Sequence, residues 1–556
     1  MRERGNDDWY PEDFSEREVE IPEFLEHQRE EGYRTGYSGG AQHYNEGIPP
    51  YYDGEPHQIP PFSEDGQTPP HTQKPPVSKK QHNRVYGRVA YLFSAMFLAL
   101  VGYMAYFQIS LADELKANPN NTKADEQKQY VVRGSIYSAD GEILAGTNVD
   151  EEGNETRVYP YDNLFAHVVG YTTNGKSGIE AMYNSDLLTS NTSIVDQVGK
   201  GVNNEKVRGD NLILTLDTTL QTAASQALGA YRGAVVVMKP DTGAVLAMVS
   251  KPDFDPNQMD ELWEYLIAED AHSPLLNRAT QGLYPPGSTF KIMTALEYIQ
   301  EHPDDYMDYS FQCDGYLTQG DVTIQCFDGA VHGFENLQQS FQNSCNTSFA
   351  NIGLQLDLDR FHDLCEKFLF NGDLPTLMPY SSSQFVLNSD SSYGDIMTTS
   401  FGQGDTLVSP LHMALIAGTI ANDGVMMYPY FVQRVENTEG VKVSETKPIA
   451  YKRMISSQEA GILKSFMQSV VEGGSGSYLW NDSYTVAGKT GSAEYEVNGN
   501  TGEEAELSTH SWFVGFSNVE DPDIVVCVIA EDGGTGSSAA VPIAKQIFDT
   551  YYYNQY

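Results

Sequence analysis

The sequence predicts an α+β protein whose largest domain is built around an antiparallel sheet flanked by helices, with an additional all-helical part. Three observations lead to this prediction. Residues 233–251 form two β-rich hydrophobic runs around a turn, residues 510–516 and 523–530 form two more strand patterns near the C-terminus, and helical patterns such as 410–422 lie between them. Strands at both ends of a domain, with helices between, are typical of an antiparallel sheet that joins the two ends.

The composition excludes several classes of protein. A chain of 556 residues has room for two or three domains. With 77 acidic residues against 34 Lys and Arg, the formal charge is -43, so the protein should repel nucleic acids rather than bind them through counterion release. The five cysteines form no C-x-x-C pair, which argues against a zinc ribbon, an iron–sulfur site and a thioredoxin motif. We therefore expect no metal, no cofactor and no nucleic-acid partner.

Residues 1–83 predict a disordered, acidic cytoplasmic tail. They are rich in Pro, Gly, Tyr and Gln and have no hydrophobic period. Such a segment cannot bury enough apolar surface to offset its chain entropy.

Residues 84–110 predict one membrane-spanning helix. The uncharged stretch 89–109 is long enough to cross a hydrocarbon core of ~30 Å, whereas a buried core helix, the alternative, is usually shorter and amphipathic. All charged residues between 74 and 88 are basic, so the positive-inside rule places the N-terminus in the cytoplasm and the rest of the chain outside. Because the stretch lies far from the start of the chain, we expect an uncleaved signal anchor.

Two domains are expected after this helix. Residues 111–204 predict a small α+β pedestal of the dimerisation type, in which residues 131–137 and 142–145 form a hairpin around Asp140-Gly141. Residues 205–556 form the large domain, which carries the candidate residues for chemistry.

The first candidate pair is Ser288 and Lys291. A loop rich in Pro and Gly leads into a helical pattern at Ser288, and Lys291 lies three residues later on the same helical face. A serine becomes a nucleophile when a neighbour takes its proton, and a lysine can do so only if burial or another cation lowers its pKa. The same S-x-x-K spacing occurs at Ser444 and Lys447, but the following proline and polar neighbours argue against a helix there.

A second motif, Ser344-Cys345-Asn346, provides partners for this pair. Ser344 can relay a proton between Lys291 and a leaving nitrogen, and the Asn346 amide can hold a peptide substrate. Cys345 lies between these two residues.

A third motif follows on an expected strand and consists of Lys489, Thr490, Gly491 and Ser492. The cation and the hydroxyls suit a substrate carboxylate, and a glycine permits close approach of the backbone. A similar triplet at 176–178 precedes the nucleophile, so order and spacing distinguish the two.

Together these motifs resemble those of the class B penicillin-binding proteins, the D,D-transpeptidases of bacterial cell-wall synthesis. The resemblance covers nearly everything after residue 130, and the compact pedestal is most similar to that of the short PbpA-like Gram-positive branch. Its further motifs are R-G-x-I at 133–136, G-x-x-L-A at 141–145, G-I-E at 178–180 and F-G-Q-G at 401–404.

The resemblance implies a DD-peptidase/β-lactamase-like fold and an acyl transfer on peptidoglycan stem peptides that end in D-Ala-D-Ala. Ser288 would attack the penultimate D-Ala carbonyl, with Lys291 as the base and Ser344 passing the proton. The backbone N–H groups of Ser288 and Ser492 would hold the oxyanion. Lys489 would bind the terminal carboxylate and keep Lys291 neutral. β-Lactams would trap the nucleophile, the membrane would hold the chain, and a membrane glycosyltransferase is an expected partner.

Several alternatives stay open on the sequence. A D,D-carboxypeptidase or β-lactamase shares the acylation machinery and admits water, although no E-x-x-L-N-like element supplies a deacylating base. A β-lactam sensor would need a cytoplasmic output, and the tail has no H-E-x-x-H motif. A non-catalytic scaffold of the wall-building complex is at odds with the intact motif set. Cys313 and Cys326 bracket a glycine-rich turn, and the sequence leaves open whether they form a disulfide or stay reduced.

Overall fold

The computed structural model describes residues 79–110, 122–193, 205–268, 272–496 and 507–553, together with residues 197, 199, 200 and 202. The predicted disorder of residues 1–78 and the first residues of the predicted pedestal, 111–121, lie outside the described residues.

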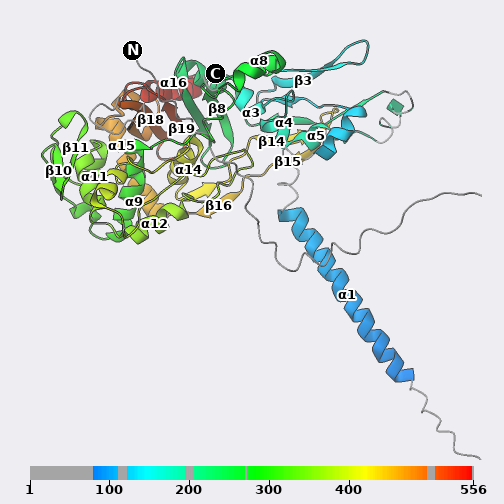
Figure 1. Ribbon diagram of the computed structural model, residues 1–556, viewed down its shortest axis with the longest axis horizontal. Coiled ribbons are helices and arrows are strands. Elements are labelled where there is room, and N and C mark those ends of the chain that lie inside the picture. The colour runs from blue at the N-terminus through cyan, green and yellow to red at the C-terminus, as the bar shows by residue number, and fades with distance from the viewer. Residues whose placement is uncertain are drawn as a thin grey trace, which may run out of the picture. The chain divides into compact units, whose positions relative to one another are not determined.

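Helix α1 (Lys79–Ser110) contains the predicted membrane span (Figure 1). Its segment Tyr86–Gln108 has a mean hydropathy of 1.7, and its side chains are not buried against the protein. The helix is therefore long and apolar enough to cross a membrane. It begins at Lys79, inside the range predicted as tail, because Lys and Gln are good helix formers.

A five-stranded antiparallel sheet forms the centre of the large domain, in the order β17-β18-β19-β7-β8. The predicted hairpin is confirmed, since its two runs pair from Gly233 opposite Lys251 onward. The C-terminal strands pair with its first strand, so the sheet joins the two ends of the domain as predicted. The strands are β7 (Gly233–Met238), β8 (Val245–Lys251), β17 (Val486–Glu496), β18 (Leu507–Ser517) and β19 (Val525–Ala530).

Both faces of this sheet are buried, and alternate residues of each strand serve different layers. In β7, Val235 and Val237 pack in a cluster with α7 (Thr218–Leu228) and α16 (Ala540–Tyr553), whereas Val236 faces the opposite core. This alternation is the period of two expected of a strand. The fully apolar run therefore gives a strand buried on both sides.

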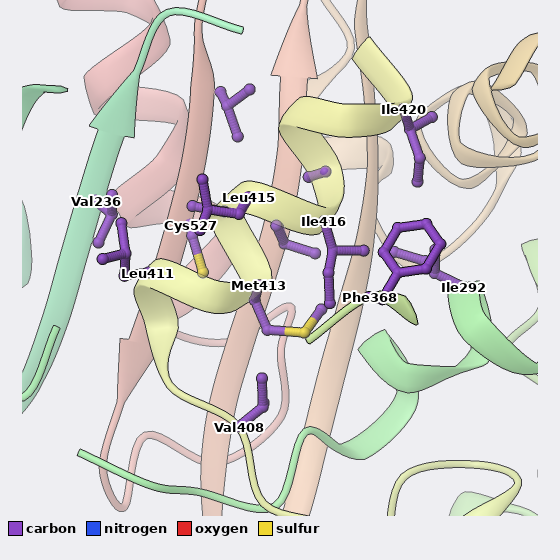
Figure 2. Close-up of a cluster of buried hydrophobic side chains, with 14 of the residues drawn as sticks. Val236, Ile292, Phe368, Val408, Leu411, Met413, Leu415, Ile416, Ile420 and Cys527 are labelled. Carbon is purple, nitrogen blue, oxygen red and sulfur yellow. The ribbon is translucent and has the colours of Figure 1, made fainter. Parts of the chain in front are cut away.

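Helix α14 (Pro410–Ala421) fills the second core and is buried at every residue. The Ser409 side chain caps its N-terminus by accepting the His412 N–H, and Pro410 takes the first helical position. In Figure 2 the helix lies between the sheet and the helical part, and its two sides contact different partners. Leu411 and Leu415 lie toward Val236 and Cys527, and Ile416 and Ile420 lie toward Ile292 and Phe368.

The helical part of the domain lies on the α14 side of the sheet (Figure 1). It also holds two small antiparallel pairs, β9 with β12 and β10 with β11. Its helices are α9 (Lys291–Glu301), α10 (Leu337–Gln342), α11 (Asn346–Gly353), α12 (Leu358–Lys367), α13 (Tyr393–Thr399) and α15 (Ser457–Gly473). Its small strands are β9 (Phe311–Cys313), β10 (Tyr316–Gln319), β11 (Val322–Gln325) and β12 (Gly333–Glu335).

The pedestal has its own six-stranded sheet, in the order β15-β14-β6-β2-β3-β4. The predicted hairpin is present, because Ile136 pairs with Ala145 across the Asp140-Gly141 turn. Three strands of this sheet come from beyond residue 205. The strands are β2 (Ile136–Tyr137), β3 (Ile143–Val149), β4 (Glu155–Val158), β6 (Asn211–Leu214), β14 (Val432–Glu436) and β15 (Lys442–Glu445), with a separate pair of β1 (Val131–Val132) and β5 (Val207–Arg208).

A buried carboxylate explains two of the sequence motifs in the pedestal. Glu180, on α4 (Gly178–Met182), is fully buried and accepts from Arg133 Nε and Arg157 Nε, both at 2.6 Å. Arg133 also donates to Asn184 Oδ1 at 2.5 Å. The motifs around Arg133 and Glu180 thus hold one ion-pair network that connects a strand region to a helix.

We expect Glu180→Ala to lower the free energy of unfolding by about 3–5 kcal/mol, because it leaves two arginines buried without their counter-charge. Denaturant titration of the detergent-solubilised protein measures this change. Glu155→Ala is the control, since the Glu155–Lys206 pair is partly exposed and should cost less than about 1 kcal/mol. Equal losses in the two variants would contradict the assigned role of Glu180.

Candidate active site

Ser288 lies on a short 3-10 helix, Gly287–Phe290, which leads directly into α9. Two hydrogen bonds hold this loop, from Gly287 N–H to Gly402 O at 2.8 Å and from Trp512 Nε1 to Pro285 O at 3.0 Å. Gly287 has a φ of +53°, and a Cβ there would lie 2.7 Å from Ser492 O. Only glycine therefore lets the serine loop pack so closely against β17.

Lys291, the first residue of α9, is fully buried beside Ser344 and Asn346. Its Nζ donates to Ser344 O at 2.7 Å, to Asn346 Oδ1 at 2.8 Å and to Ser344 Oγ at 3.2 Å. Burial lowers the pKa of Lys291 to about 7. A large fraction of the amine is therefore neutral near pH 7 and can accept a proton.

Ser344 lies in the tight turn between α10 and α11 and adopts a left-handed conformation with φ of +57°. This conformation is costly for a residue with a Cβ and persists only where its surroundings fix it. Two backbone hydrogen bonds define the turn, from Ser344 N–H to Phe341 O at 3.2 Å and from Cys345 N–H to Ser340 O at 2.9 Å. The turn directs the Ser344 hydroxyl toward the two motif lysines.

Lys489 approaches the same hydroxyl from β17. Its Nζ donates to Ser344 Oγ at 2.9 Å, and the side chain is fully buried. Burial and the positive charge of Lys291 lower the pKa of Lys489 well below its ordinary value. Ser344 Oγ is thus shared by two desolvated amines, an arrangement suited to moving a proton.

The remaining motif residues lie along β17, an edge strand of the central sheet. Thr490 Oγ1 lies 2.5 Å from Ser475 Oγ, and Ser492 Oγ accepts from Gly536 N–H at 3.1 Å. Gln403 Nε2 donates to Ser492 O at 3.3 Å. An edge strand leaves alternate backbone groups without a strand partner, so this edge is available to an extended substrate.

The predicted site residues meet at one cleft of ≈ 1120 Å³. Lys291 and Lys489 lie buried beside it, bonded to Ser344. The cleft is lined by residues of all three motifs, namely Ser288, Ser344, Asn346, Thr490, Gly491 and Ser492. Asn346 has contacts on both sides, because its amide oxygen accepts from Lys291 and its nitrogen donates to Gln325 O at 3.3 Å.

The structure places the two decoy motifs elsewhere. Ser444 is exposed on β15 in the pedestal sheet, not at the start of a helix. Ser177 is the residue before α4. Neither lines the cleft.

Several contacts of the cleft were not predicted. It is also lined by Ser475, Thr535, Gly536 and Ser537. For the last three of these, the glycine-rich run 533–536 after β19 is a sequence signal that could have indicated a loop at the site. The sulfurs of Cys313 and Cys326 lie 3.7 Å apart and both thiols are free, so the structure has no disulfide at the pair left open by the sequence.

The comparisons with known proteins agree with this geometry. Residues 233–549 match the family described as the penicillin binding protein transpeptidase domain, and residues 133–212 match the penicillin binding protein A dimerisation domain. The chain belongs to the penicillin-binding proteins that carry a transpeptidase domain.

Individual relatives come from the same family. The chain is 31% identical to the peptidoglycan D,D-transpeptidase PbpA of Mycolicibacterium smegmatis over 82% of this chain and 96% of that protein. It is similar to the D,D-transpeptidase domain of a peptidoglycan glycosyltransferase from Eggerthella lenta, with 33% identity, a TM-score of 0.68 and coverage of 77% of this chain and 99% of that one. It is also similar to the ceftriaxone acyl-enzyme complex of penicillin-binding protein A from M. tuberculosis, with 26% identity, a TM-score of 0.69 and coverage of 77% and 100%.

The pKa of Lys291 predicts how acylation depends on pH. If Lys291 is the base, it acts as the neutral amine, so below about pH 7 the rate of acylation by a fluorescent penicillin should fall about tenfold per pH unit. Above that pH the rate should level off, because the amine is already free. Stopped-flow labelling of the full chain measures the profile.

Lys447→Met, at the exposed decoy position, is the control and should leave this profile unchanged. A rate that is constant from about pH 5 to pH 8, or that falls as the pH rises, would contradict Lys291 as the base.

Proposed function

We propose that this chain is a peptidoglycan D,D-transpeptidase that cross-links stem peptides through a Ser288 acyl-enzyme and is inhibited by β-lactams. The single observation that carries the proposal is the Ser344 hydroxyl, which lies within hydrogen-bond distance of two buried lysine amines beside the cleft lined by Ser288. The relatives named peptidoglycan D,D-transpeptidase support the same assignment.

Acylation begins when Ser288 Oγ attacks the carbonyl of the penultimate D-Ala. Neutral Lys291 accepts the hydroxyl proton, and Ser344 passes a proton to the nitrogen of the leaving D-Ala. The backbone N–H groups of Ser288 and Ser492 stabilise the oxyanion, where the loss of one donor costs ~3 kcal/mol.

Lys489 and the hydroxyls of Thr490 and Ser492 bind the terminal carboxylate of the donor peptide. A substrate carboxylate compensates the buried charge of Lys489, so binding favours its ammonium form. That form in turn disfavours protonation of Lys291 through like-charge repulsion. Binding of the correct donor thus prepares the base.

We further propose that the N-terminus is cytoplasmic and that the large domain acts outside the membrane. The basic residues between 74 and 88, directly before the span, support this orientation. Cross-linking acts on glycan strands that a polymerase must supply, so we propose a membrane glycosyltransferase as the working partner.

Ser288→Ala should abolish labelling of the full chain by fluorescent penicillin, with a loss of at least about 10³-fold, because no acyl-enzyme can form. Ser444→Ala, the matched serine of the decoy S-x-x-K motif, should be labelled as the wild type is. Equal labelling of Ser288→Ala and the wild type would exclude Ser288 as the nucleophile.

Product analysis then separates transfer from hydrolysis. A donor peptide that ends in D-Ala-D-Ala, together with an amine acceptor, should give the cross-linked product and free D-Ala. If hydrolysed donor were the sole product, the activity would be that of a D,D-carboxypeptidase.

The orientation predicts the outcome of protease treatment of intact cells with the outer envelope removed. The large domain should be cut from outside while an N-terminal epitope tag stays protected, because the two lie on opposite sides of the membrane. Protection of the large domain together with loss of the tag would reverse the assignment.

A further inference from the structure

Three cysteines and one histidine from separate segments meet beside the Ser344 turn, and two of them, Cys326 and His332, also line the cleft. Cys313 ends β9, Cys326 follows β11, His332 precedes β12, and Cys345 lies between Ser344 and the first residue of α11. Their sulfur and imidazole nitrogen atoms all lie within 4.8 Å of one another, and the three cysteines are buried. We name these four residues the thiol cluster.

The distances within the thiol cluster match those between the ligands of a tetrahedral zinc ion. The Sγ atoms of Cys313 and Cys326, and those of Cys326 and Cys345, are 3.7 Å apart. With Zn–S bonds of ≈ 2.3 Å, two thiolates of a tetrahedral site lie about 3.8 Å apart. His332 Nδ1 lies 3.3 Å from Cys313 Sγ and 3.8 Å from Cys326 Sγ, on either side of the about 3.6 Å expected between a sulfur and a nitrogen ligand.

The surroundings of the thiol cluster suit thiolates rather than apolar packing. The Thr347 hydroxyl lies 3.3–3.4 Å from all three sulfurs, and Ser348 N–H donates to Cys345 Sγ at 3.4 Å. Cys345 also caps the N-terminus of α11, where the helix dipole favours a thiolate. A purely hydrophobic cluster would not be expected to contain this hydroxyl, amide and imidazole.

We propose that the thiol cluster binds one Zn²⁺ ion as a Cys₃His site. Soft thiolates and an imidazole in tetrahedral arrangement select zinc among the common divalent ions. Four protein ligands close the coordination shell, which indicates a structural and not a catalytic ion. Binding exchanges three thiol protons for the ion and releases these protons to solvent.

The ion would stabilise a part of the domain that has little core of its own. Residues 311–335 form two small strand pairs, and Phe327 and Phe334 are exposed. A small separate cluster in this region consists of the three thiol-cluster cysteines, with Phe311 packed against it, whereas Ile324 packs into the main core. Small elements of this kind commonly depend on a metal or a disulfide for stability.

The same ion would fix the proton-relay turn. Cys345 is flanked by Ser344 and Asn346, the two residues bonded to Lys291. A Cys345–zinc bond would hold the backbone between these two residues and help to keep Ser344 at its left-handed φ. Cys345 is thus a positioning residue, and this part of the inference rests on the function proposed above.

Metal analysis of the full chain, purified in detergent without added metal, tests the site. We expect about one zinc per chain by mass spectrometry. Cys326→Ser and His332→Gln should each lower the zinc content about tenfold or more. Cys365→Ser and Cys527→Ser are matched controls, because both cysteines are buried and free but lie outside the thiol cluster, and they should retain the ion.

A second measurement covers the case in which the cluster variants fail to fold. Wild-type protein exchanged with Co²⁺ should show the strong thiolate-to-cobalt charge-transfer absorption that tetrahedral thiolate ligation produces. Absence of both zinc and this absorption, zinc that survives in folded cluster variants, or an intact Cys313–Cys326 disulfide in the purified protein would each overturn the site.

The positioning role has its own readout. Chelation should lower the rate of penicillin acylation, and added Zn²⁺ should restore it. Full acylation by protein that has lost its zinc would overturn the positioning role. The zinc content itself does not depend on acylation, so failure of the metal site and failure of the proposed function remain distinguishable.

Discussion

The arrangement at the cleft depends on one constraint, the burial of two lysine amines around a single serine hydroxyl. In water both amines would be charged and would repel each other, and neither could act as a base. Burial of Lys291 and Lys489 next to Phe349 and Phe341 removes the solvent that favours the charged forms. The sheet, α9 and the Ser344 turn have to be held in place for the two amines to stay buried around this hydroxyl.

The central sheet and the helical part therefore form the two sides of one site. Lys489 comes from the edge strand of the sheet, whereas Lys291 and Ser344 come from the helical part. Helix α14 is buried at every residue and packs against both parts (Figure 2), so a change in the packing of one part affects the other. A cavity created in this helix would be expected to disturb the site as well as the stability, because cores resist local change.

Much of the fold and the site followed from the sequence because the signals were local. The apolar runs of β7 and β8 around Pro240-Gly243, and the helix after Ser288, each depend on residues a few positions apart. The decoy at Ser444 was separable for the same reason. By contrast, the left-handed turn at Ser344 has no local glycine signal, because distant partners impose the conformation.

The thiol cluster is a clearer example of a feature that local sequence signals do not reveal. The sequence contains no C-x-x-C pair, in which two metal-binding cysteines lie on one turn of the chain. The expectation of no metal rested on this absence. In the proposed site each ligand would come from a different strand or turn, and only the pairing of β9 with β12 and the packing of α11 bring the four residues together. Likewise, the supply of three pedestal strands from beyond residue 205 is a property of topology that composition cannot reveal.

That shared sheet has a consequence for synthesis and for protein engineering. Thr215, next to β6, bonds through its N–H to the carbonyl of Phe431, next to β14, 216 positions later. The ribosome must therefore complete most of the catalytic region before the pedestal can close, and loop closure over such a span is slow. The two regions share one sheet, so a pedestal cut off at residue 204 would lack half of its strands and is a poor candidate for grafting onto another enzyme as an autonomous module.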